Sequence, residues 1–565
     1  MNIIVSLRII LYISLLVFLL PLYSFDRITG LNFASRSEVI ATNGMAATSH
    51  PLATQTAISI LRNGGNAIDA AIAANAVLGL VEPTGCGIGG DLFAIVWVED
   101  DKKLYGLNAS GPSPKNLNIN YFKKNNLTVI PPYGHLPVTI PGAVLGWAEL
   151  HKKFGKLEFE ELFVDSINYA NKGFPVSETV AYYLNRASEE FSSYPNFADV
   201  WMKNGQTPLK GEIFKNPSLA NTYKLIAKSY GNEFYKGKIA QKIVRFLNNQ
   251  GGLHEMSDFK NYNVEWIKPV STNYRGYDIW ELPPNGQGIA ALQILNILEP
   301  YNLTDMGHNS AQYIHLFTEA KKLVYEDRAK YYADPNFSKI PLETLLSKDY
   351  AKKRSKLISL EKAALSYAAG NLEHGDTIYL TVADRFGNMI SLIQSNYRGM
   401  GSGMVPDGLG FMLQDRGEMF SLDPLHKNAL VGGKRPFHTI IPAFVTKNGK
   451  PFMSFGLMGG AMQPQGHAQI MINLIDFKMN LQEAGDAPRF RHYDSSQPTG
   501  ELMLDGGYLA LESGINFETI RDLQHYGHII KFEPGGFGGY QAIMKIDNTL
   551  YGASESRKDG HASGY

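Results

Sequence analysis

The sequence predicts a mixed α/β (α+β) protein, and three observations support this prediction. Residues 377–383 alternate between two kinds of side chain, as a β-strand does, and a second such stretch follows at 389–395. Residues 53–80 are rich in Ala, Ile and Leu, which is typical of a buried helix. The 55 Gly, 30 Tyr and 29 Phe residues suit many strands and tight turns. We therefore expect strands and helices to be interleaved along the 565 residues.

Composition limits the partners that the chain can have. Lys plus Arg and Asp plus Glu both number 53, so no net charge attracts nucleic acid. The single cysteine, Cys86, excludes an intrachain disulfide and a CxxC metal site. We expect no nucleic-acid partner, no metal and no cofactor.

The first 25 residues are expected to direct the protein out of the cytoplasm. Residues 9–20 are continuously apolar and follow Arg8, as in a signal peptide. No A-x-A cleavage site follows, and residues 3–23 are just long enough to span a bilayer. Residues 1–25 are therefore a cleaved signal peptide or a retained anchor. Either one predicts a secreted, periplasmic or outward-facing membrane-anchored protein, which contacts the membrane only through this segment.

The helical run at 53–80 is followed by a glycine cluster. Asn63–Asn66 breaks the run, and its second half is apolar on nearly all sides, so it is expected to be buried. Gly85–Asp91 precedes a strand, Leu92–Trp97, whereas a phosphate-binding loop follows a strand and opens a helix. Crowding of the backbone between the helix and the strand accounts better for these glycines. We expect Cys86 to be a packed side chain.

The middle of the chain is mainly helical, from about 144 to 265 and again from 310 to 370. Between them lie a strand, Tyr277–Glu281, and the stretch Pro283–Gly288, which opens an Ala/Leu helix. No internal repeat or low-complexity linker divides the sequence. A cut within the chain would therefore nick one domain and would not separate two.

Two strands near residue 380 are expected to form a hairpin around the turn residues Asp384–Asn388. If the pairing contains no bulge, Ala383 faces Met389, and Thr377 then lies opposite Ser395. Two hydroxyls would meet at the open end of this hairpin. One interpretation is an ordinary hairpin with solvated hydroxyls. The other is that the bond before Thr377 is cut, which makes Thr377 an N-terminal nucleophile.

A second pair of residues supports the catalytic interpretation. The strand Pro451–Gly456 leads through Gly459 and Gly460 into a helix from about Pro464 to Asp476. Glycines at such a turn leave backbone N–H groups unpaired at the helix N-terminus, where they can bind an oxyanion.

In combination, these stretches resemble the gamma-glutamyltranspeptidase (glutathione hydrolase) family of N-terminal-nucleophile hydrolases. The resemblance implies a four-layer αββα fold, built as one domain, and autocleavage between Asp376 and Thr377. Residues 26–376 would form a heavy chain and residues 377–565 a light chain, and the two would stay associated. The matching stretches run in order along the chain: Gly65–Ala71, Glu82–Gly90, Pro141–Gly142, Gly375–Thr381, Gly401–Gly403, Gly459–Gly460 and Glu483–Phe490.

The resemblance also implies a mechanism. The Thr377 hydroxyl attacks an amide carbonyl, with its own α-amine as the base. Gly459 and Gly460 hold the oxyanion, and Ser395 matches a family hydroxyl that bonds to the nucleophile. Water or an amino-acid or peptide acceptor then resolves the acyl-enzyme. The predicted activity is hydrolysis or transfer of gamma-glutamyl groups.

Substrate recognition departs from the family pattern. Asn108 stands where the family has an arginine for the glutamate α-carboxylate, and His438 and Thr439 replace two serines. Arg416 and Met419 replace the residues that receive the α-ammonium. These changes resemble the divergent branch that includes oxamate amidohydrolase and cephalosporin acylase. Alternatives are therefore an amidase of another small amide, with Arg416 binding a carboxylate, or an unprocessed exported binding protein. His438 is either a ligand-facing donor or a packed loop histidine.

Overall fold

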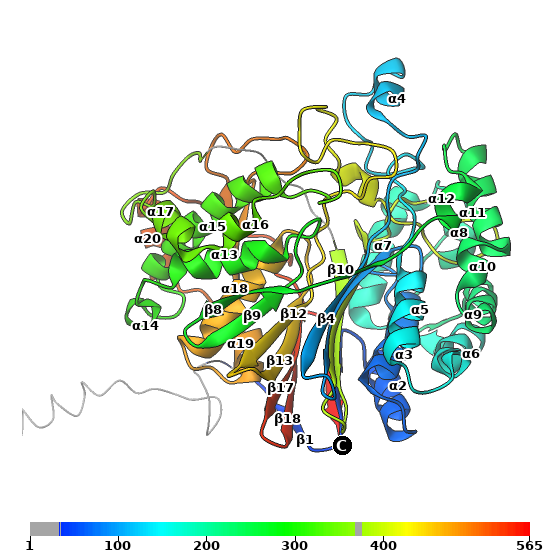
Figure 1. Ribbon diagram of the computed structural model, residues 1–565, viewed down its shortest axis with the longest axis horizontal. Helices are drawn as coiled ribbons and strands as arrows, with labels where there is room; N and C mark the ends of the chain where they lie inside the picture. The colour runs from blue at the N-terminus through cyan, green and yellow to red at the C-terminus, as the bar shows by residue number, and fades with distance from the viewer. Residues whose placement is uncertain (1–32, 34, 368–375) are drawn as a thin grey trace, which may run out of the picture. The chain divides into compact units, whose positions relative to one another are not determined.

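The computed structural model describes residue 33 and residues 35–367 and 376–565 (Figure 1). The chain divides into two units, 1–37 and 38–565, and all that follows concerns the second. The predicted signal or anchor, residues 1–25, lies outside the described residues. Within the described part of the chain, no helix is long and apolar enough to cross a membrane.

Two seven-stranded antiparallel sheets form the centre of the fold. The first sheet has the strand order β19-β2-β10-β11-β3-β4-β7, and the second has the order β1-β18-β17-β13-β12-β9-β8. The first sheet consists of β2 (Met45–Thr48), β3 (Asp91–Val98), β4 (Lys103–Ala109), β7 (Glu265–Ile267), β10 (Asp376–Ala383), β11 (Met389–Tyr397) and β19 (His561–Gly564). The second consists of β1 (Val39–Ala41), β8 (Val270–Tyr274), β9 (Tyr277–Glu281), β12 (Ala443–Lys447), β13 (Lys450–Leu457), β17 (Tyr540–Ile546) and β18 (Thr549–Ser554).

Helices cover the outer face of each sheet (Figure 1). The first sheet packs on α2 (Pro51–Arg62), α3 (Ala67–Val81) and α5 (Ala143–Phe154) through one apolar core. The second packs on α13 (Gly288–Leu298), α15 (Ala311–Tyr331) and α18 (Met462–Ile475) through another. A third core, which includes Phe93, Tyr379 and Phe444, lies between the sheets. The predicted four-layer αββα fold is confirmed.

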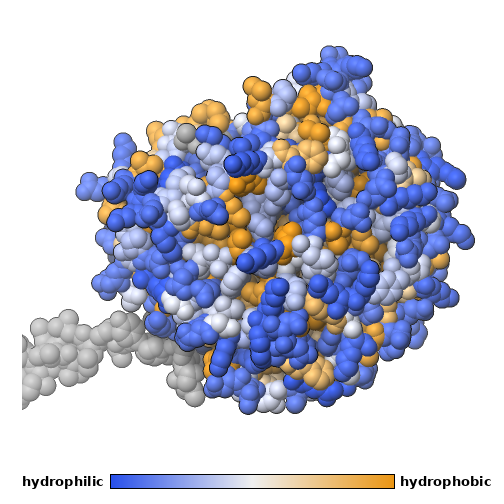
Figure 2. All heavy atoms as spheres, viewed as in Figure 1, coloured by the Kyte–Doolittle hydropathy of each residue, from blue (hydrophilic) through white to orange (hydrophobic). Residues whose placement is uncertain are grey.

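The remaining elements surround these layers. The other helices are α4 (Ile119–Lys124), α6 (Val164–Lys172), α7 (Glu178–Phe191), α8 (Phe197–Trp201), α9 (Pro217–Ser229), α10 (Asn232–Tyr235), α11 (Lys238–Asn249), α12 (Met256–Lys260), α14 (Leu303–Met306), α16 (Leu342–Leu346), α17 (Lys348–Ser355), α19 (Leu481–Asp486) and α20 (Phe517–His525), with 3-10 turns η1 (Phe159–Phe163) and η2 (Arg416–Met419). Two small sheets contain β14 (Phe490–Tyr493), β15 (Tyr508–Leu511) and β16 (Ile529–Lys531), and β5 (Phe174–Pro175) and β6 (Ile213–Phe214). Figure 2 shows polar side chains over most of the viewed face, with smaller apolar areas between them.

The predicted break in the first helical run separates α2 from α3. Asn66 caps α3, because its side chain accepts hydrogen bonds from the N–H groups of Ile68 and Asp69. The prediction that 310–370 is mainly helical is wrong for residues 356–367, which follow the end of α17 at Ser355, and residues 368–370 lie outside the described residues. Side chains of α15 bind the backbone there instead. Glu319 accepts from the Ala364 N–H, and Lys322 donates to the Ala364 carbonyl.

The β10–β11 hairpin has the predicted register except at its open end. Ala383 pairs with Met389, as expected, but Asp376 pairs with Tyr397 because β11 contains one extra residue. The prediction of a hairpin without a bulge is therefore wrong at its last pair. Tyr397 supplies the local cause, since its φ of 82° is left-handed and bends the strand.

The glycine cluster before β3 is crowded by backbone, as predicted. A Cβ on Gly89 would lie 2.0 Å from the Met412 carbonyl oxygen, and one on Gly90 would lie 2.3 Å from the Ser395 carbonyl oxygen. Cys86 is buried beside them. These glycines therefore bring the first helical layer against the open end of the hairpin.

Candidate active site

The open end of the hairpin places two hydroxyls between the sheets. Thr377 and Ser395 are on the same face as Tyr379 and Ile393, which belong to the core between the sheets. The Thr377 hydroxyl donates to the Ser395 hydroxyl at 3.3 Å, and both side chains are buried. Ser395 Oγ also accepts from the Tyr397 N–H at 2.8 Å. The bulge thus fixes Ser395 beside Thr377 even though the pairing there is irregular.

The helix that follows β13 of the second sheet supplies a third group to Thr377. Gln463, in the first turn of α18, donates from Nε2 to the Thr377 hydroxyl at 3.4 Å. Its Oε1 accepts from the Ile441 N–H at 2.9 Å, which orients the amide. Gln463 was not among the residues predicted from the sequence. Its position three residues after Gly460, at the start of the predicted helix, was the available signal.

Gly459 and Gly460 form the turn between β13 and α18, and we call this pair the diglycine turn. Their φ angles of 118° and 58° are left-handed, which favours glycine. The Gly459 carbonyl accepts from the Met462 N–H at 3.0 Å, and the Gly460 carbonyl from the Gln463 N–H at 3.1 Å. Among the described residues, neither glycine N–H donates a hydrogen bond. Because a peptide is planar, the Gly459 carbonyl that is held toward the helix leaves the Gly460 N–H, on the opposite side of the same peptide, available to an oxyanion.

Arg416 is a buried cation with unused donors. It lies in η2, its NH1 donates to the Thr439 hydroxyl at 2.7 Å, and its guanidinium lies 4.3 Å from the Tyr397 ring centroid. Its Nε and NH2 have no hydrogen-bond partner among the described residues. Burial lowers its pKa to about 10, so it is still charged at neutral pH. A planar carboxylate would satisfy both free donors.

Two carboxyl groups lie beside Arg416 in the chain. Glu418 is engaged by Arg398, which bonds both of its oxygens at 2.6 Å. Asp415 accepts from the Arg398 N–H, but its Oδ2 is buried with no partner in the described structure. Burial, followed by the charge of Glu418, raises the pKa of Asp415 well above its usual range. Burial therefore favours the neutral form of Asp415.

Asp91 connects the loops that carry these groups, and sequence reasoning missed it. Its Oδ1 accepts from the N–H groups of Gly111 and Gly142 and from Gln414 Nε2, at 3.1, 3.2 and 2.9 Å. Its Oδ2 lies 3.0 Å from His438 Nε2. Burial raises the pKa of Asp91 to about 7. The available signal was a carboxylate at the first position of an otherwise apolar strand.

His438 and Asn108 are near this network, but their polar atoms are used internally. His438 Nδ1 accepts from the Ile440 N–H at 3.3 Å, and its ring packs on Phe93 at 4.8 Å. Burial lowers its pKa well below the usual value. Asn108 donates to Asn285 Oδ1 at 2.8 Å and accepts from the Ser110 hydroxyl at 2.7 Å. Of the proposed substrate contacts, Arg416 is the one whose side chain has buried nitrogens with no partner among the described residues.

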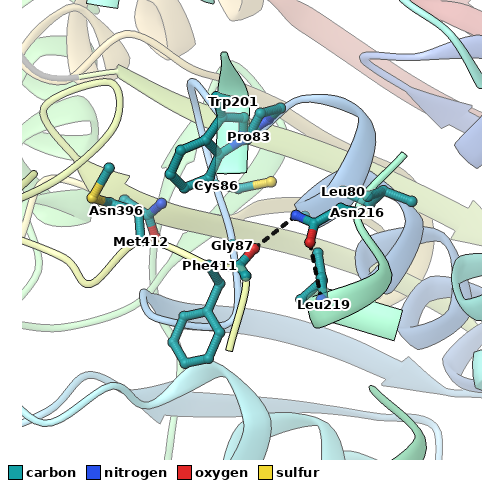
Figure 3. A pocket seen from close by; sticks show the side chains of 12 residues that line it. Leu80, Pro83, Cys86, Gly87, Trp201, Asn216, Leu219, Asn396, Phe411 and Met412 are labelled. Atoms are coloured by element: carbon teal, nitrogen blue, oxygen red, sulfur yellow. Dashed lines mark hydrogen bonds between the residues drawn. The ribbon is translucent and has the colours of Figure 1, made fainter. Parts of the chain in front are cut away.

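Two other features lie apart from these groups. Figure 3 shows a small pocket lined by Cys86, Trp201 and Asn396, on the helical face of the first sheet and not between the sheets. Among the described residues, His315, Glu319 and His528 come nearest to a metal-ligand arrangement. Their ligand atoms are already engaged: His315 bonds to His528 at 2.8 Å, and Glu319 pairs with Lys322 at 2.8 Å.

Comparison with known proteins gives consistent matches along the chain. The family model for gamma-glutamyltranspeptidase matches residues 53–565. The glutathione hydrolase-like YwrD proenzyme of Bacillus subtilis is 38% identical over 534 residues, which cover 93% of this chain and 99% of that protein. The oxamate amidohydrolase proenzyme of Klebsiella pneumoniae is 31% identical, covering 94% and 100%. The crystal structure of cephalosporin acylase from Bacillus halodurans superposes with a TM-score of 0.88 and 41% identity, covering 96% and 99%.

Proposed function

The chain belongs to the gamma-glutamyltranspeptidase family, and we propose that it is an autoprocessing amide hydrolase and acyltransferase with Thr377 as its nucleophile. One observation carries this proposal. The buried Thr377 hydroxyl lies 3.3 Å from Ser395 Oγ and 3.4 Å from Gln463 Nε2, beside a turn whose two N–H groups have no partner within the described part of the chain. An ordinary solvated hairpin hydroxyl would not be buried between two sheets.

Autoprocessing would begin at the Asp376–Thr377 peptide bond. Thr377 Oγ1 attacks the carbonyl carbon of Asp376 and loses its proton, and the C–N bond then breaks. The nitrogen that departs is the α-nitrogen of Thr377 itself, which takes up a proton. Water hydrolyses the resulting ester, which leaves the Asp376 carboxylate at the end of the heavy chain and a free amine and hydroxyl on Thr377.

Turnover would then use the freed amine as the base, because its pKa of about 7.7–8 suits neutral pH. Thr377 Oγ1 adds to the substrate carbonyl as its proton passes to the amine, and the diglycine turn holds the oxyanion. The C–N bond of the substrate breaks, and its leaving amine takes that proton. Water, or an acceptor amine, attacks the acyl-threonine ester and restores the Thr377 hydroxyl.

Gamma-glutamyl amides are the first substrate class that we propose, since relatives of this chain are named glutathione hydrolases. In this reading Arg416 binds the α-carboxylate, and the unpaired Oδ2 of Asp415 receives the α-ammonium. Binding of the ammonium would require the ionised form of Asp415, which burial disfavours.

A second candidate is an amide whose acyl group has a carboxylate but no ammonium, such as a glutaryl amide or oxamate. The specific observation is that burial raises the pKa of Asp415 well above its usual range, while Arg416 stays charged. Burial thus disfavours a negative charge on Asp415, which favours a ligand that brings negative charge alone. The names of two relatives, an oxamate amidohydrolase and a cephalosporin acylase, agree with this class.

A substrate panel separates the two candidates. Purified enzyme is assayed with glutathione, gamma-glutamyl anilide, glutaryl anilide and oxamate. The first candidate predicts release of glutamate from glutathione, and a large loss of that activity in Asp415→Asn. The second predicts hydrolysis of glutaryl anilide or oxamate, with little effect of Asp415→Asn. If no amide is cleaved by a self-processed protein, the hydrolase assignment fails, and a binding protein becomes the better reading.

The heavy and light chains are proposed to stay associated after the cut. Support comes from the first sheet, where light-chain strands β10 and β11 lie between heavy-chain strands β2 and β3. Co-elution of both chains in gel filtration would support this, and their separation without denaturant would contradict it.

Export through residues 1–25 is also a proposal, tested by N-terminal sequencing of protein recovered outside the cytoplasm.

A further inference from the structure

We propose that Gln287 is a positioning residue that couples the carboxylate-binding loop to the oxyanion turn. It belongs to Pro283–Gly288, a stretch to which the proposed mechanism gives no role. This inference rests on the proposed function at Thr377, because it concerns how that site is held.

The side chain of Gln287 connects the loop that contains Thr439 to the diglycine turn. Its Nε2 donates to the Thr439 carbonyl at 2.7 Å and to the Gly460 carbonyl at 2.9 Å. Thr439 is the residue whose hydroxyl accepts from Arg416. Gly460 is the second residue of the diglycine turn. One primary amide therefore contacts both the loop that holds the cation and the turn that holds the oxyanion.

The amide of Gln287 is itself held from the second helical layer. Its Oε1 accepts from Arg328 NH1 at 2.7 Å, and Arg328 lies in α15, 3.9 Å above the Tyr325 ring centroid. Arg328 NH2 bonds to the Ser496 carbonyl and to Gln497 Oε1 at 3.0 and 2.9 Å. Gln287 and Arg328 are both fully buried. This support fixes which end of the amide faces the two carbonyls.

The side chain of Gln287 is not used to cap the helix that it precedes. Gln287 is the N-cap residue of α13, yet its side chain makes no capping hydrogen bond. Ser, Thr, Asp or Asn is the usual choice for capping. The side chain instead extends to groups 152 and 173 residues away in the sequence. Helix stability therefore does not explain a glutamine at this position.

The contact has a catalytic consequence because it restrains the residue that carries one of the oxyanion N–H groups. The Gly460 carbonyl belongs to the Gly460–Ala461 peptide, and Gln287 and the Gln463 N–H both bond to it, so the C-terminal side of Gly460 is held from two sides. The Gly459 carbonyl, which lies opposite the Gly460 N–H in the preceding peptide, is held by the Met462 N–H. Oxyanion donors are effective because they are already in place before the reaction. A substrate carboxylate bound to Arg416 would hold Thr439 in place through the hydrogen bond between Arg416 and Thr439. Because Gln287 bonds to both Thr439 and Gly460, the diglycine turn would be held in place as well. We expect the substrate carboxylate to raise kcat in addition to lowering KM.

The test is a comparison of Gln287→Met with Gln293→Met. Gln293 is a matched control in the same helix, also buried, and bonded to Asp327 at 3.0 Å and to Tyr332 at 2.5 Å, away from the site. Each enzyme is assayed on gamma-glutamyl or glutaryl anilide, whichever the wild type cleaves faster. The same acyl group without its carboxylate, 4-aminobutyryl or butyryl anilide, is assayed in parallel.

We expect Gln287→Met to lose about 10- to 100-fold in kcat on the carboxylated anilide, with a smaller change in KM. The kcat advantage of the carboxylated over the uncarboxylated substrate should disappear in this variant and persist in Gln293→Met. The inference is overturned if kcat is unchanged, if it falls equally for both substrates, or if the control loses as much.

Two further variants are assayed so that the test gives a result even if Gln287→Met does not process itself. If Gln287→Met does not cleave itself, Arg328→Lys is assayed in the same way, because it removes the planar support and leaves Gln287 in place. A kcat advantage that survives in Arg328→Lys overturns the inference. Thr377→Ala is run beside them, since activity in that variant would refute the proposed function and not the role of Gln287.

Discussion

Replacing Arg416 with Met is expected to abolish use of carboxylated substrates without destabilising the protein. Met fills a similar volume but removes the charge and all of the donors. In the folded protein, Arg416 has one hydrogen bond, to Thr439, and two nitrogens with no described partner. The guanidinium is therefore held ready for a ligand at a cost to stability.

The structure gives the expected size of the loss in kcat/KM and of the change in the free energy of unfolding. A carboxylate would accept two charged hydrogen bonds, each worth about 1.5–3 kcal/mol, so kcat/KM should fall by about 10²–10⁴-fold. Burial lowers the pKa of Arg416 from 12.5 to about 10, which corresponds to about 3 kcal/mol against the charged form. Losing the Thr439 bond and the Tyr397 stacking offsets part of that gain. We expect the free energy of unfolding to stay equal or to rise by up to about 2 kcal/mol.

Arg489 provides a matched control for this experiment. It is equally buried, and burial likewise lowers its pKa to about 10, but it pairs with Glu555 at 2.9 Å. Glu555 also pairs with Arg557, so Arg489→Met removes one of its two cations and leaves the Phe537 carbonyl without the donor that Arg489 supplies. We expect this variant to lose about 1–3 kcal/mol. Urea unfolding of the two variants, with kinetics on carboxylated and neutral anilides, measures both quantities.

The reasoning is refuted if Arg416→Met is destabilised as much as Arg489→Met. That result would mean that Arg416 is a structural cation and that its two nitrogens are satisfied within the protein. Equal losses of kcat/KM on carboxylated and neutral anilides would also refute it, since a carboxylate-binding residue should affect only the first substrate.

Three further predictions concern the surroundings of Thr377. Ser395→Ala removes the hydroxyl 3.3 Å from the nucleophile and should slow self-cleavage about 10- to 100-fold, followed as band conversion on denaturing gels. Gly90→Ala would place a Cβ 2.3 Å from the Ser395 carbonyl oxygen, so precursor should accumulate uncut, and normal processing would contradict the crowding argument. The pKa of Asp91 is about 7 in the folded protein and 3.8 in the unfolded chain, so the folded state binds the proton more tightly. The free energy of unfolding should therefore fall as the pH rises from about 4 to 7. Asp91→Asn should remove up to about 1.4 kcal/mol per pH unit of that slope, measured by urea titration at several pH values.

Local patterns were sufficient to predict much of the fold. The Ala-rich run at 53–80 gave α2 and α3, because apolar residues on all sides of a helix need burial on all sides. Alternation at 377–383 gave β10 and the face on which Thr377 lies. The glycines at 85–90 were attributed correctly to backbone crowding, since their order relative to the strand excluded a phosphate loop.

Tertiary contacts decide what the sequence did not predict. The bulge opposite Thr377 depends on a left-handed Tyr397, which alternation of side chains does not encode. Asp91 contacts His438, which is 347 residues away in the sequence, and Gln463 contacts Thr377, which is 86 residues away. Hydrophobic periodicity carries no information on such polar pairs. Gln287 was similarly visible only as part of a turn before a helix.

The central claim is that Thr377 becomes the first residue of a separate chain and carries the acyl group. Mass spectrometry of purified protein, before and after brief exposure to a slow substrate, tests it most directly. We predict a light chain of residues 377–565 that gains the mass of the acyl group on its N-terminal threonine, and an uncut, unlabelled chain for Thr377→Ala. A single uncut wild-type chain with amidase activity, or acylation at another residue, would contradict the account.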